Sequence, residues 1–292
     1  MRYPERYPDF KKVKKMLPQP ELIEIFPDFK LDVLHTAGQK PALVFIHGGL
    51  GNLWNHYAQF SHFYQRQEIL AYSLAGNGNS DQHIKHSLQT HIDDLKNLLT
   101  LYEIQRPILC GWSYGTALVL EYSKKHPVDG LIFTGGAAFG MTPAWELPMM
   151  KIILFLRLYK IIPGGPFMKQ LASWAVLHPN SPDRLLDEVL KTNPFPRRRS
   201  AWKTVVDDFW NYDGRENLDR IQVPSLVVHG PADRIVPIER AKKTAEMLPR
   251  CKFIRLSGTG HAAPVERYDR YNQFIEYLIQ GSHTFGRSQS TL

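Results

Sequence analysis

Six stretches of the chain are almost entirely apolar over six to nine positions, and most of them end in glycine. Continuous apolar runs of this length are typical of strands buried on both faces, because both sides of such a strand contact a core. The stretches are ALVFIHGG (42–49), EILAYSLAG (68–76), PILCGW (107–112), GLIFTGG (130–136), VPSLVVHG (223–230) and CKFIRLSG (251–258).

Helical patterns lie between these runs. Apolar side chains recur there every three or four positions, as on one face of a helix. The segments are 87–103, 114–126, about 238–248 and about 264–280. Ahead of them, residues 21–26 and 29–36 predict a β-hairpin around Pro27-Asp28. Alternating strands and helices predict an α/β fold, a mostly parallel central sheet with helices on both faces.

The alternation stops between residues 137 and 215. This segment contains several prolines and helical apolar patches but no clear strand, so we expect a helical, apolar insertion. It divides the predicted α/β core into residues 21–136 and 216–281. Residues 1–20 are predicted to form a basic N-terminal arm that is solvated and only partly ordered. Residues 282–292 are predicted to be a flexible tail.

Half of the formal net charge of +8 lies in the first 15 residues, which hold six basic and two acidic side chains. A nucleic-acid-binding protein usually carries its excess charge on an organised face or in a reading module. Neither is recognisable here, so no nucleic-acid partner is predicted. An alternative expectation for the arm is weak peripheral contact with an anionic membrane, because each basic residue near such a surface contributes about 1 kcal/mol. Lys151, Arg157 and Lys160, which alternate with apolar residues, could also let the insertion rest on a membrane surface.

The sequence predicts a cytoplasmic protein. Its N-terminus lacks the apolar segment of a secretory signal. Its longest apolar stretch, residues 149–162, is shorter than a membrane span and is interrupted by three basic residues. The two cysteines, Cys110 and Cys251, provide neither a disulfide framework nor a metal-binding spacing.

The sequence GWSYG places Ser113 between two glycines where a buried strand gives way to a helix. A tight turn at such a point strains the backbone and lifts the serine side chain clear of the chain. The glycines remove the side chains that would obstruct the turn. The alternative is an ordinary strand-to-helix turn with a serine cap.

A serine nucleophile needs a base, and the base needs an orienting acid. Asp233 follows the strand of LVVHGPADRIVP, and His261 follows the next strand, in IRLSGTGHAAP. Functional groups of open parallel sheets collect beyond the carboxyl ends of the strands. Because Ser113, Asp233 and His261 share that location and follow one another in a known triad order, we predict that they are catalytic.

Attack on a carbonyl also requires hydrogen-bond donors for the oxyanion. The glycine-rich turn FIHGGLGN (45–52) follows an earlier buried strand. The backbone N–H of Gly49, together with that of Tyr114, is the predicted oxyanion hole. The turn lacks the spacing and the lysine of a phosphate-binding P-loop.

With these motifs, the chain resembles the α/β-hydrolase superfamily from about residue 20 to residue 281. HGGLGN resembles the oxyanion turn of that family, GWSYG its nucleophile elbow, and residues 73–81 its Asp-x-x-Gly-x-Gly-x-Ser segment. Residues 137–215 fall where the family inserts a helical cap. Two residues depart from the pattern, since Ser73 stands where aspartate is usual and Asn77 where histidine is common.

The resemblance implies a serine hydrolase that works through an acyl-enzyme and needs no metal or organic cofactor. The apolar composition of residues 137–180 favours a lipophilic carboxylic ester as the substrate. Three other functions stay open: a prolyl-type serine aminopeptidase, a hydrolase of carbon–carbon bonds, and a non-catalytic binding protein on this scaffold. An acid in the cap would favour the aminopeptidase, and the available acids are Glu146, Asp183, Asp187 and Glu188.

Overall fold

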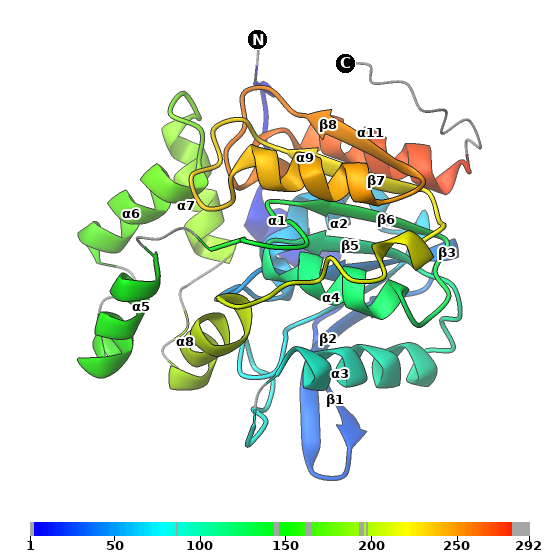
Figure 1. The fold of residues 1–292 in the computed structure, drawn as a ribbon, viewed down its shortest axis with the longest axis horizontal. Helices are drawn as coiled ribbons and strands as arrows, with labels where there is room; N and C mark the ends of the chain where they lie inside the picture. Colours follow the sequence, from blue (N-terminus) through cyan, green and yellow to red (C-terminus); the bar gives the residue numbers. More distant parts are fainter. Residues whose placement is uncertain are drawn as a thin grey trace.

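The computed structural model of the chain describes residues 3–85, 87–142, 146–161, 165–192, 196 and 198–281. The tail predicted at 282–292 lies outside the described residues. A sheet of eight strands, in the order β1-β2-β4-β3-β5-β6-β7-β8, forms the centre of the molecule (Figure 1). The strands are β1 (Glu21–Phe26), β2 (Phe29–Thr36), β3 (Gln39–Ile46), β4 (Gln67–Tyr72), β5 (Ile108–Trp112), β6 (Gly130–Thr134), β7 (Ser225–His229) and β8 (Cys251–Arg255).

The six strands from β4 to β8 along this order pair in parallel, whereas β2 is antiparallel to both β1 and β4. This arrangement confirms the predicted α/β fold with a mostly parallel sheet. The strands are shorter than the apolar runs, because the terminal glycines belong to loops. Strand β3, for example, ends at Ile46, and Gly49 lies in the turn beyond it.

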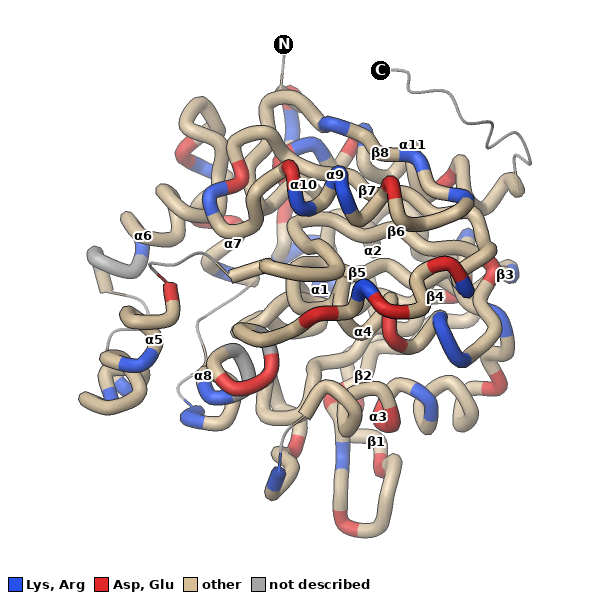
Figure 2. Tube along the Cα trace, viewed as in Figure 1, with Lys and Arg blue, Asp and Glu red and all other residues tan. Residues whose placement is uncertain are grey.

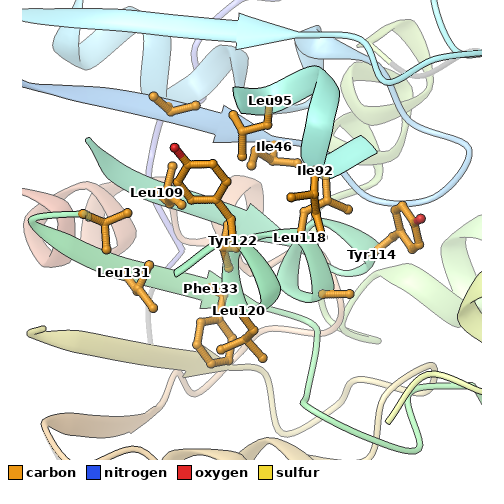
Figure 3. Close-up of a cluster of buried hydrophobic side chains, with 14 of the residues drawn as sticks. Ile46, Ile92, Leu95, Leu109, Tyr114, Leu118, Leu120, Tyr122, Leu131 and Phe133 are labelled. Carbon is orange, nitrogen blue, oxygen red and sulfur yellow. The ribbon is translucent and has the colours of Figure 1, made fainter. Parts of the chain in front are cut away.

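Helices cover both faces of the sheet. One face carries α3 (Leu88–Leu101), α4 (Tyr114–Ser123) and α9 (Ile238–Met247), and the other carries α2 (Tyr57–Phe63) and α11 (Tyr268–Ile279). Successive residues of a strand point to opposite faces. Ile46 of β3 therefore joins the core under α3 and α4 (Figure 3), while its neighbour Phe45 joins the core under α2 and α11. Two cores explain why the strand sequences are apolar without alternation.

Between β6 and β7, the described residues form helices and a single isolated β-bridge. Figure 1 shows these helices gathered at one end of the sheet. The bridge joins Phe139 to Asp213, and the Gly214 N–H donates to the Ala138 carbonyl oxygen at 2.7 Å, so the two ends of the insertion are held together. The elements are α5 (Glu146–Phe155), η2 (Leu158–Lys160), α6 (Pro166–Val176), α7 (Asp183–Thr192), α8 (Arg199–Thr204) and the π-turn η3 (Val205–Phe209).

The structure corrects the expectation of a solvated N-terminal arm. Residues Phe10–Met16 form helix α1, which is capped by the Asp9 side chain. Val13 and Leu17 are buried, while the neighbouring lysines stay exposed. The Phe10 N–H donates to the Glu188 carboxylate of α7, so this segment connects the core to the insertion. The many lysines suggested a solvated segment, but Val13 and Leu17 are four residues apart and so lie on the same, buried face of an amphipathic helix.

The closing helix is also divided. Its expected span contains α10 (Ala263–Glu266) and α11, separated by Arg267 in a non-helical conformation. Short turns complete the fold at η1 (Leu53–His56) and η4 (Leu218–Arg220). No helix in the described part of the chain has the length and apolar composition to cross a membrane.

Candidate active site

Ser113 occupies a strained turn between β5 and α4. Its backbone φ of 55° and ψ of −115° lie outside the regions that residues with a side chain normally adopt. The turn is held by the Ser113 N–H, which donates to the Thr134 carbonyl oxygen at 2.8 Å. Strain of this kind costs about 1–3 kcal/mol, and it persists because surrounding contacts enforce it.

The two glycines of GWSYG are required by close backbone packing. A Cβ on Gly115 would lie 2.4 Å from the Ile46 carbonyl oxygen, and a Cβ on Gly111 would lie 2.7 Å from the Gly115 carbonyl oxygen. Since these neighbours are main-chain atoms of adjacent strand and helix, they cannot move aside cheaply. The serine turn is therefore pressed directly against the end of β3.

Asp233 and His261 meet beyond the ends of β7 and β8. The His261 Nδ1–H donates to Asp233 Oδ2 at 2.8 Å. Asp233 Oδ1 accepts the backbone N–H groups of Ile235 at 2.8 Å and Val236 at 2.9 Å, so both carboxylate oxygens have fixed partners. These backbone donors fix the orientation of the Asp233 carboxylate, and through it that of His261.

The electrostatics of the pair favour its charged form. Burial alone would raise the pKa of Asp233, but the attraction and hydrogen bond of His261 outweigh it and hold the pKa below its usual value. Burial alone would lower the pKa of His261, but Asp233 outweighs it and raises the pKa above the ordinary value, with Glu146 adding to the rise. An imidazole in this setting accepts a proton more readily than a solvated one.

Ser113 and His261 line one cavity, which encloses about 160 Å³ beneath the inserted helices. Among the described residues, no hydrogen bond joins Ser113 to His261. The geometry thus brings all three predicted residues to one site, with Asp233 behind the histidine. Apolar groups form most of the cavity wall: Leu50, Trp112, Met149, Met150, Leu171, Ala172, Ala175, Val176, Val189, Leu190, Trp202, Ile235 and Val265.

Glu146, the first residue of α5, is the one acidic side chain among the described residues that line this cavity. Its Oε2 atom is buried and has no hydrogen-bond partner among the described residues. Burial raises the pKa of Glu146 to about 7; the attraction of His261 opposes the rise, and the negative charge of Asp233 adds to it. A carboxyl group with an open acceptor therefore faces the space above the serine.

The turn predicted to supply the oxyanion hole is organised by His47. The His47 Nε2 atom accepts the Leu74 N–H at 2.9 Å, so Nδ1 carries the proton and donates to the Gly48 carbonyl oxygen at 2.6 Å. Complete burial lowers the pKa of His47 to about 3, which keeps the ring neutral. Gly49 lines the cavity, and Tyr114 begins helix α4 immediately after the serine. The two N–H groups thus come from segments that flank Ser113.

Comparison with known proteins identifies the family. A profile described as "Alpha/beta hydrolase family" matches residues 43–274. The chain belongs to the alpha/beta hydrolase family. It is 26% identical over 258 residues to the AB hydrolase superfamily protein YisY of Bacillus subtilis, covering 83% of this chain and 92% of that protein.

Two further relatives of this alpha/beta hydrolase differ in their activities. A 2-hydroxy-6-oxononadienedioate/2-hydroxy-6-oxononatrienedioate hydrolase of Paraburkholderia phymatum is 25% identical over 259 residues, with coverage of 82% and 87%. The structure of a thermophilic esterase from Thermogutta terrifontis superposes with a TM-score of 0.75 at 20% identity, with coverage of 88% and 95%. The family and its hydrolase chemistry are common to these matches, whereas the substrate is not.

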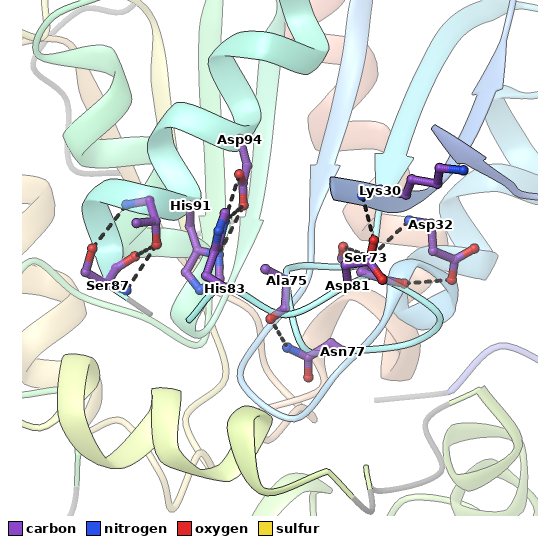
Figure 4. Close-up of polar contacts among 12 residues, drawn as sticks. Lys30, Asp32, Ser73, Ala75, Asn77, Asp81, His83, Ser87, His91 and Asp94 are labelled. Atoms are coloured by element: carbon purple, nitrogen blue, oxygen red, sulfur yellow. Dashed lines mark hydrogen bonds and ion pairs between the residues drawn. The ribbon is translucent and has the colours of Figure 1, made fainter. Parts of the chain in front are cut away.

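The segment 73–81 of this hydrolase departs from the usual pattern, and Asp32 of β2 compensates for one change. The Ser73 hydroxyl donates to Asp32 Oδ2 at 3.2 Å (Figure 4). The same carboxylate oxygen accepts the Asn79 N–H at 3.3 Å. The Ser80 hydroxyl donates to the Ser73 carbonyl oxygen at 2.6 Å. A carboxylate thus remains in the network, supplied by a neighbouring strand instead of residue 73. The Asn77 side-chain NH₂ group donates to the Ala75 carbonyl oxygen at 3.5 Å.

Two residues that hold the loops around the site were not predicted from the sequence. His47 lies within the quoted motif HGGLGN but was not assigned a role. Glu266 joins the histidine loop to the cap, because its carboxylate accepts the N–H groups of Gly260 at 2.7 Å and His178 at 2.6 Å. Its sequence position, five residues after His261, carries no signal for this contact. In the described part of the chain, no three His, Cys, Asp or Glu side chains are placed to hold a metal ion.

Proposed function

We propose that this alpha/beta hydrolase is a serine hydrolase that cleaves carboxylic esters with a lipophilic acyl group. The observation that carries the proposal is the strained Ser113, which opens with His261 into one apolar cavity. Sustained strain at a side chain with an adjacent base is typical of a nucleophile. It also argues against a non-catalytic binding protein, which would have no use for that conformation.

In the proposed mechanism, Ser113 Oγ attacks the ester carbonyl carbon while His261 Nε2 takes the serine proton. The N–H groups of Gly49 and Tyr114 stabilise the oxyanion. When the tetrahedral intermediate collapses, the bond to the alcohol oxygen breaks, and His261 returns the proton to that oxygen. Water, deprotonated by the same histidine, then attacks the acyl carbon; the bond to Ser113 Oγ breaks, His261 returns the proton to Oγ, and the carboxylic acid is released.

The cavity lining supports the choice of substrate. Apolar walls favour an acyl chain, because each buried methylene contributes about 0.8 kcal/mol. None of the described lining residues is lysine or arginine. A substrate carboxylate would therefore meet Glu146 without a lysine or arginine beside it, which argues against the 2-hydroxy-6-oxononadienedioate named for the Paraburkholderia relative.

Glu146 favours one second candidate, a serine aminopeptidase. An open carboxylate in the cavity can bind a protonated amine, and burial strengthens such a pair. The other cap acids do not line this cavity: Glu188 pairs with Lys191 and the Phe10 N–H, and Asp183 lines a separate pocket. The mechanism would be the same, with an amine as the leaving group.

Hydrolysis of p-nitrophenyl esters from acetate to dodecanoate, beside amino-acid anilides, tests the proposal. We expect kcat/KM to rise with acyl length over the first several methylenes and activity on the anilides to be much lower. Ser113→Ala is expected to abolish turnover, whereas Ser123→Ala, a buried serine of α4 outside the cavity, should retain it.

Preference for the anilides would select the aminopeptidase instead. A folded wild type that hydrolyses neither series, or a Ser113→Ala variant as active as the wild type, would contradict the proposal.

A further inference from the structure

The outer face of α5 and of the turn η2 is apolar and exposed. Four large side chains there, Ile152, Phe155, Leu156 and Ile161, are between 55% and 85% exposed. They fall within ten residues of sequence, on α5 and the turn that follows it, and are here called the α5 patch. Contiguous apolar surface on a protein usually marks a contact with another molecule or with a membrane.

Helix α5 is apolar on both faces. Its inner face buries Met150 and Ile153, and Glu146, Met149 and Met150 line the cavity above Ser113. Residues 152 and 155 lie on the opposite side of the same helix. A helix that is apolar all round is expected to be buried on all sides. The outer side of α5 is therefore exposed, although its apolar composition is typical of a buried helix.

The charged side chains of residues 147–161 are all basic, whereas η3, which packs against α5, carries Asp207 and Asp208. Lys151, Arg157 and Lys160 are exposed and interleave with the apolar side chains, and residues 147–161 contain no aspartate or glutamate. Figure 2 shows α5 at the outer edge of the molecule, on the left of the view. Within the described part of the chain, Lys151, Arg157 and Lys160 form no salt bridge.

We propose that the α5 patch docks on the surface of an anionic lipid membrane. The apolar side chains would enter the boundary between headgroups and acyl chains, while the three cations contact anionic headgroups. This combination is typical of interfacial helices. Ten residues are too few to span a bilayer, so α5 lies on the surface and does not cross it.

Docking through α5 brings the cavity to the membrane. The same helix lines the cavity and carries the patch, so a lipid ester could pass from the bilayer to Ser113 without crossing water. This assignment of the substrate source rests on the proposed function, whereas membrane docking itself does not. Binding is therefore measured on the Ser113→Ala variant, whose failure to hydrolyse leaves the docking result unaffected.

The test is sedimentation of Ser113→Ala with vesicles of pure phosphatidylcholine and of phosphatidylcholine containing 30% phosphatidylserine, a composition of about one anionic lipid in three. We expect clear preference for the anionic vesicles. In the same background, Lys151→Gln, Arg157→Gln and Lys160→Gln together should weaken binding about 100-fold, because each cation contributes about fivefold. Phe155→Ser, at an exposed position, should weaken it about tenfold.

The matched control replaces three exposed lysines on distant elements, Lys96, Lys125 and Lys242, by glutamine. It makes the same change in net charge and should retain most of the binding. No sedimentation of the parent protein, or an equal loss in the control, would overturn the proposal. Light scattering that finds the parent protein to be a dimer and Phe155→Ser to be a monomer would also overturn it, since the patch would then contact a second copy.

Discussion

Two parts of the candidate site differ in how their side chains are held: the floor, made of Ser113, Asp233 and His261 at the ends of the strands, and the cap, made of the helices inserted between β6 and β7. On the floor, Asp233 accepts two backbone N–H groups and the His261 Nδ1–H, and the Trp112 indole N–H donates to the His261 carbonyl oxygen at 2.9 Å. In the cap, Glu146 presents an oxygen with no partner among the described residues, and α5 exposes apolar side chains.

We therefore expect the floor to carry out the proposed reaction and the cap to determine which substrates are accepted. The floor is fixed by main-chain contacts at the ends of β3, β5, β7 and β8, so its geometry does not depend on which substrate enters. The cap surrounds the substrate with apolar walls and one titratable group. Changes on the floor should therefore affect all substrates alike, whereas changes in the cap should affect substrates differently.

The largest expected effect comes from Asp233→Asn. The amide can present its NH₂ group to His261, which would place the imidazole proton on the wrong nitrogen. We expect kcat to fall by about 10,000-fold on short and long esters equally. Steady-state kinetics on both substrates measures it. A loss restricted to one acyl length would break the separation between floor and cap.

The next effect concerns the stability of the floor. In Gly115→Ala, the new Cβ would lie 2.4 Å from the Ile46 carbonyl oxygen, so we expect the free energy of unfolding to fall by about 3 kcal/mol or more. Urea denaturation measures it. Gly130→Ala is the control, since its nearest neighbour would be 3.3 Å away and a smaller loss is expected. Equal losses in the two variants would contradict the packing argument.

A smaller effect sharpens the role of the cap. Ala175→Leu adds three carbon atoms to the cavity wall and should lower kcat/KM for a decanoyl ester by about tenfold or more. The acetyl ester should be affected by less than about threefold, because it does not need that space. Should both esters lose activity together, the cavity would not be the acyl site.

The smallest effect is a change in pH dependence. His261 must be neutral to accept the serine proton, and its pKa is raised, so activity should fall as the pH drops through a value above the ordinary 6.5 of histidine. Glu146 contributes to that rise. Glu146→Gln should therefore move the acidic limb of the kcat/KM profile to lower pH, with little change at alkaline pH. A limb that stays in place would show that Glu146 and His261 are not coupled.

The sequence predicted the floor well because its constraints are local. Apolar runs marked the strands, and GWSYG predicted a strained turn that the backbone of Ser113 adopts. The placement of Asp233 and His261 followed from a general property of parallel sheets, that their carboxyl ends share one edge. These predictions needed no knowledge of contacts between distant segments.

The remaining features depend on contacts that no local pattern encodes. Glu146 was one of four candidate acids, and only the fold determines that it faces the cavity. The three donors to Glu266 include Ser181, 85 positions away in the chain. Helix α1 was missed because its burial is supplied by α2 and α7, and the lysines on its outer face dominate the composition.

The most direct test of the central claim, that Ser113 is an activated nucleophile, is labelling of the purified protein with a fluorophosphonate. The wild type and Ser123→Ala should be labelled at one site, and peptide mass spectrometry should place the label on Ser113. Labelling should vanish in Ser113→Ala and become much slower in His261→Ala. A label on another residue, or no label on the folded wild type with even a small phosphonate, would contradict the account.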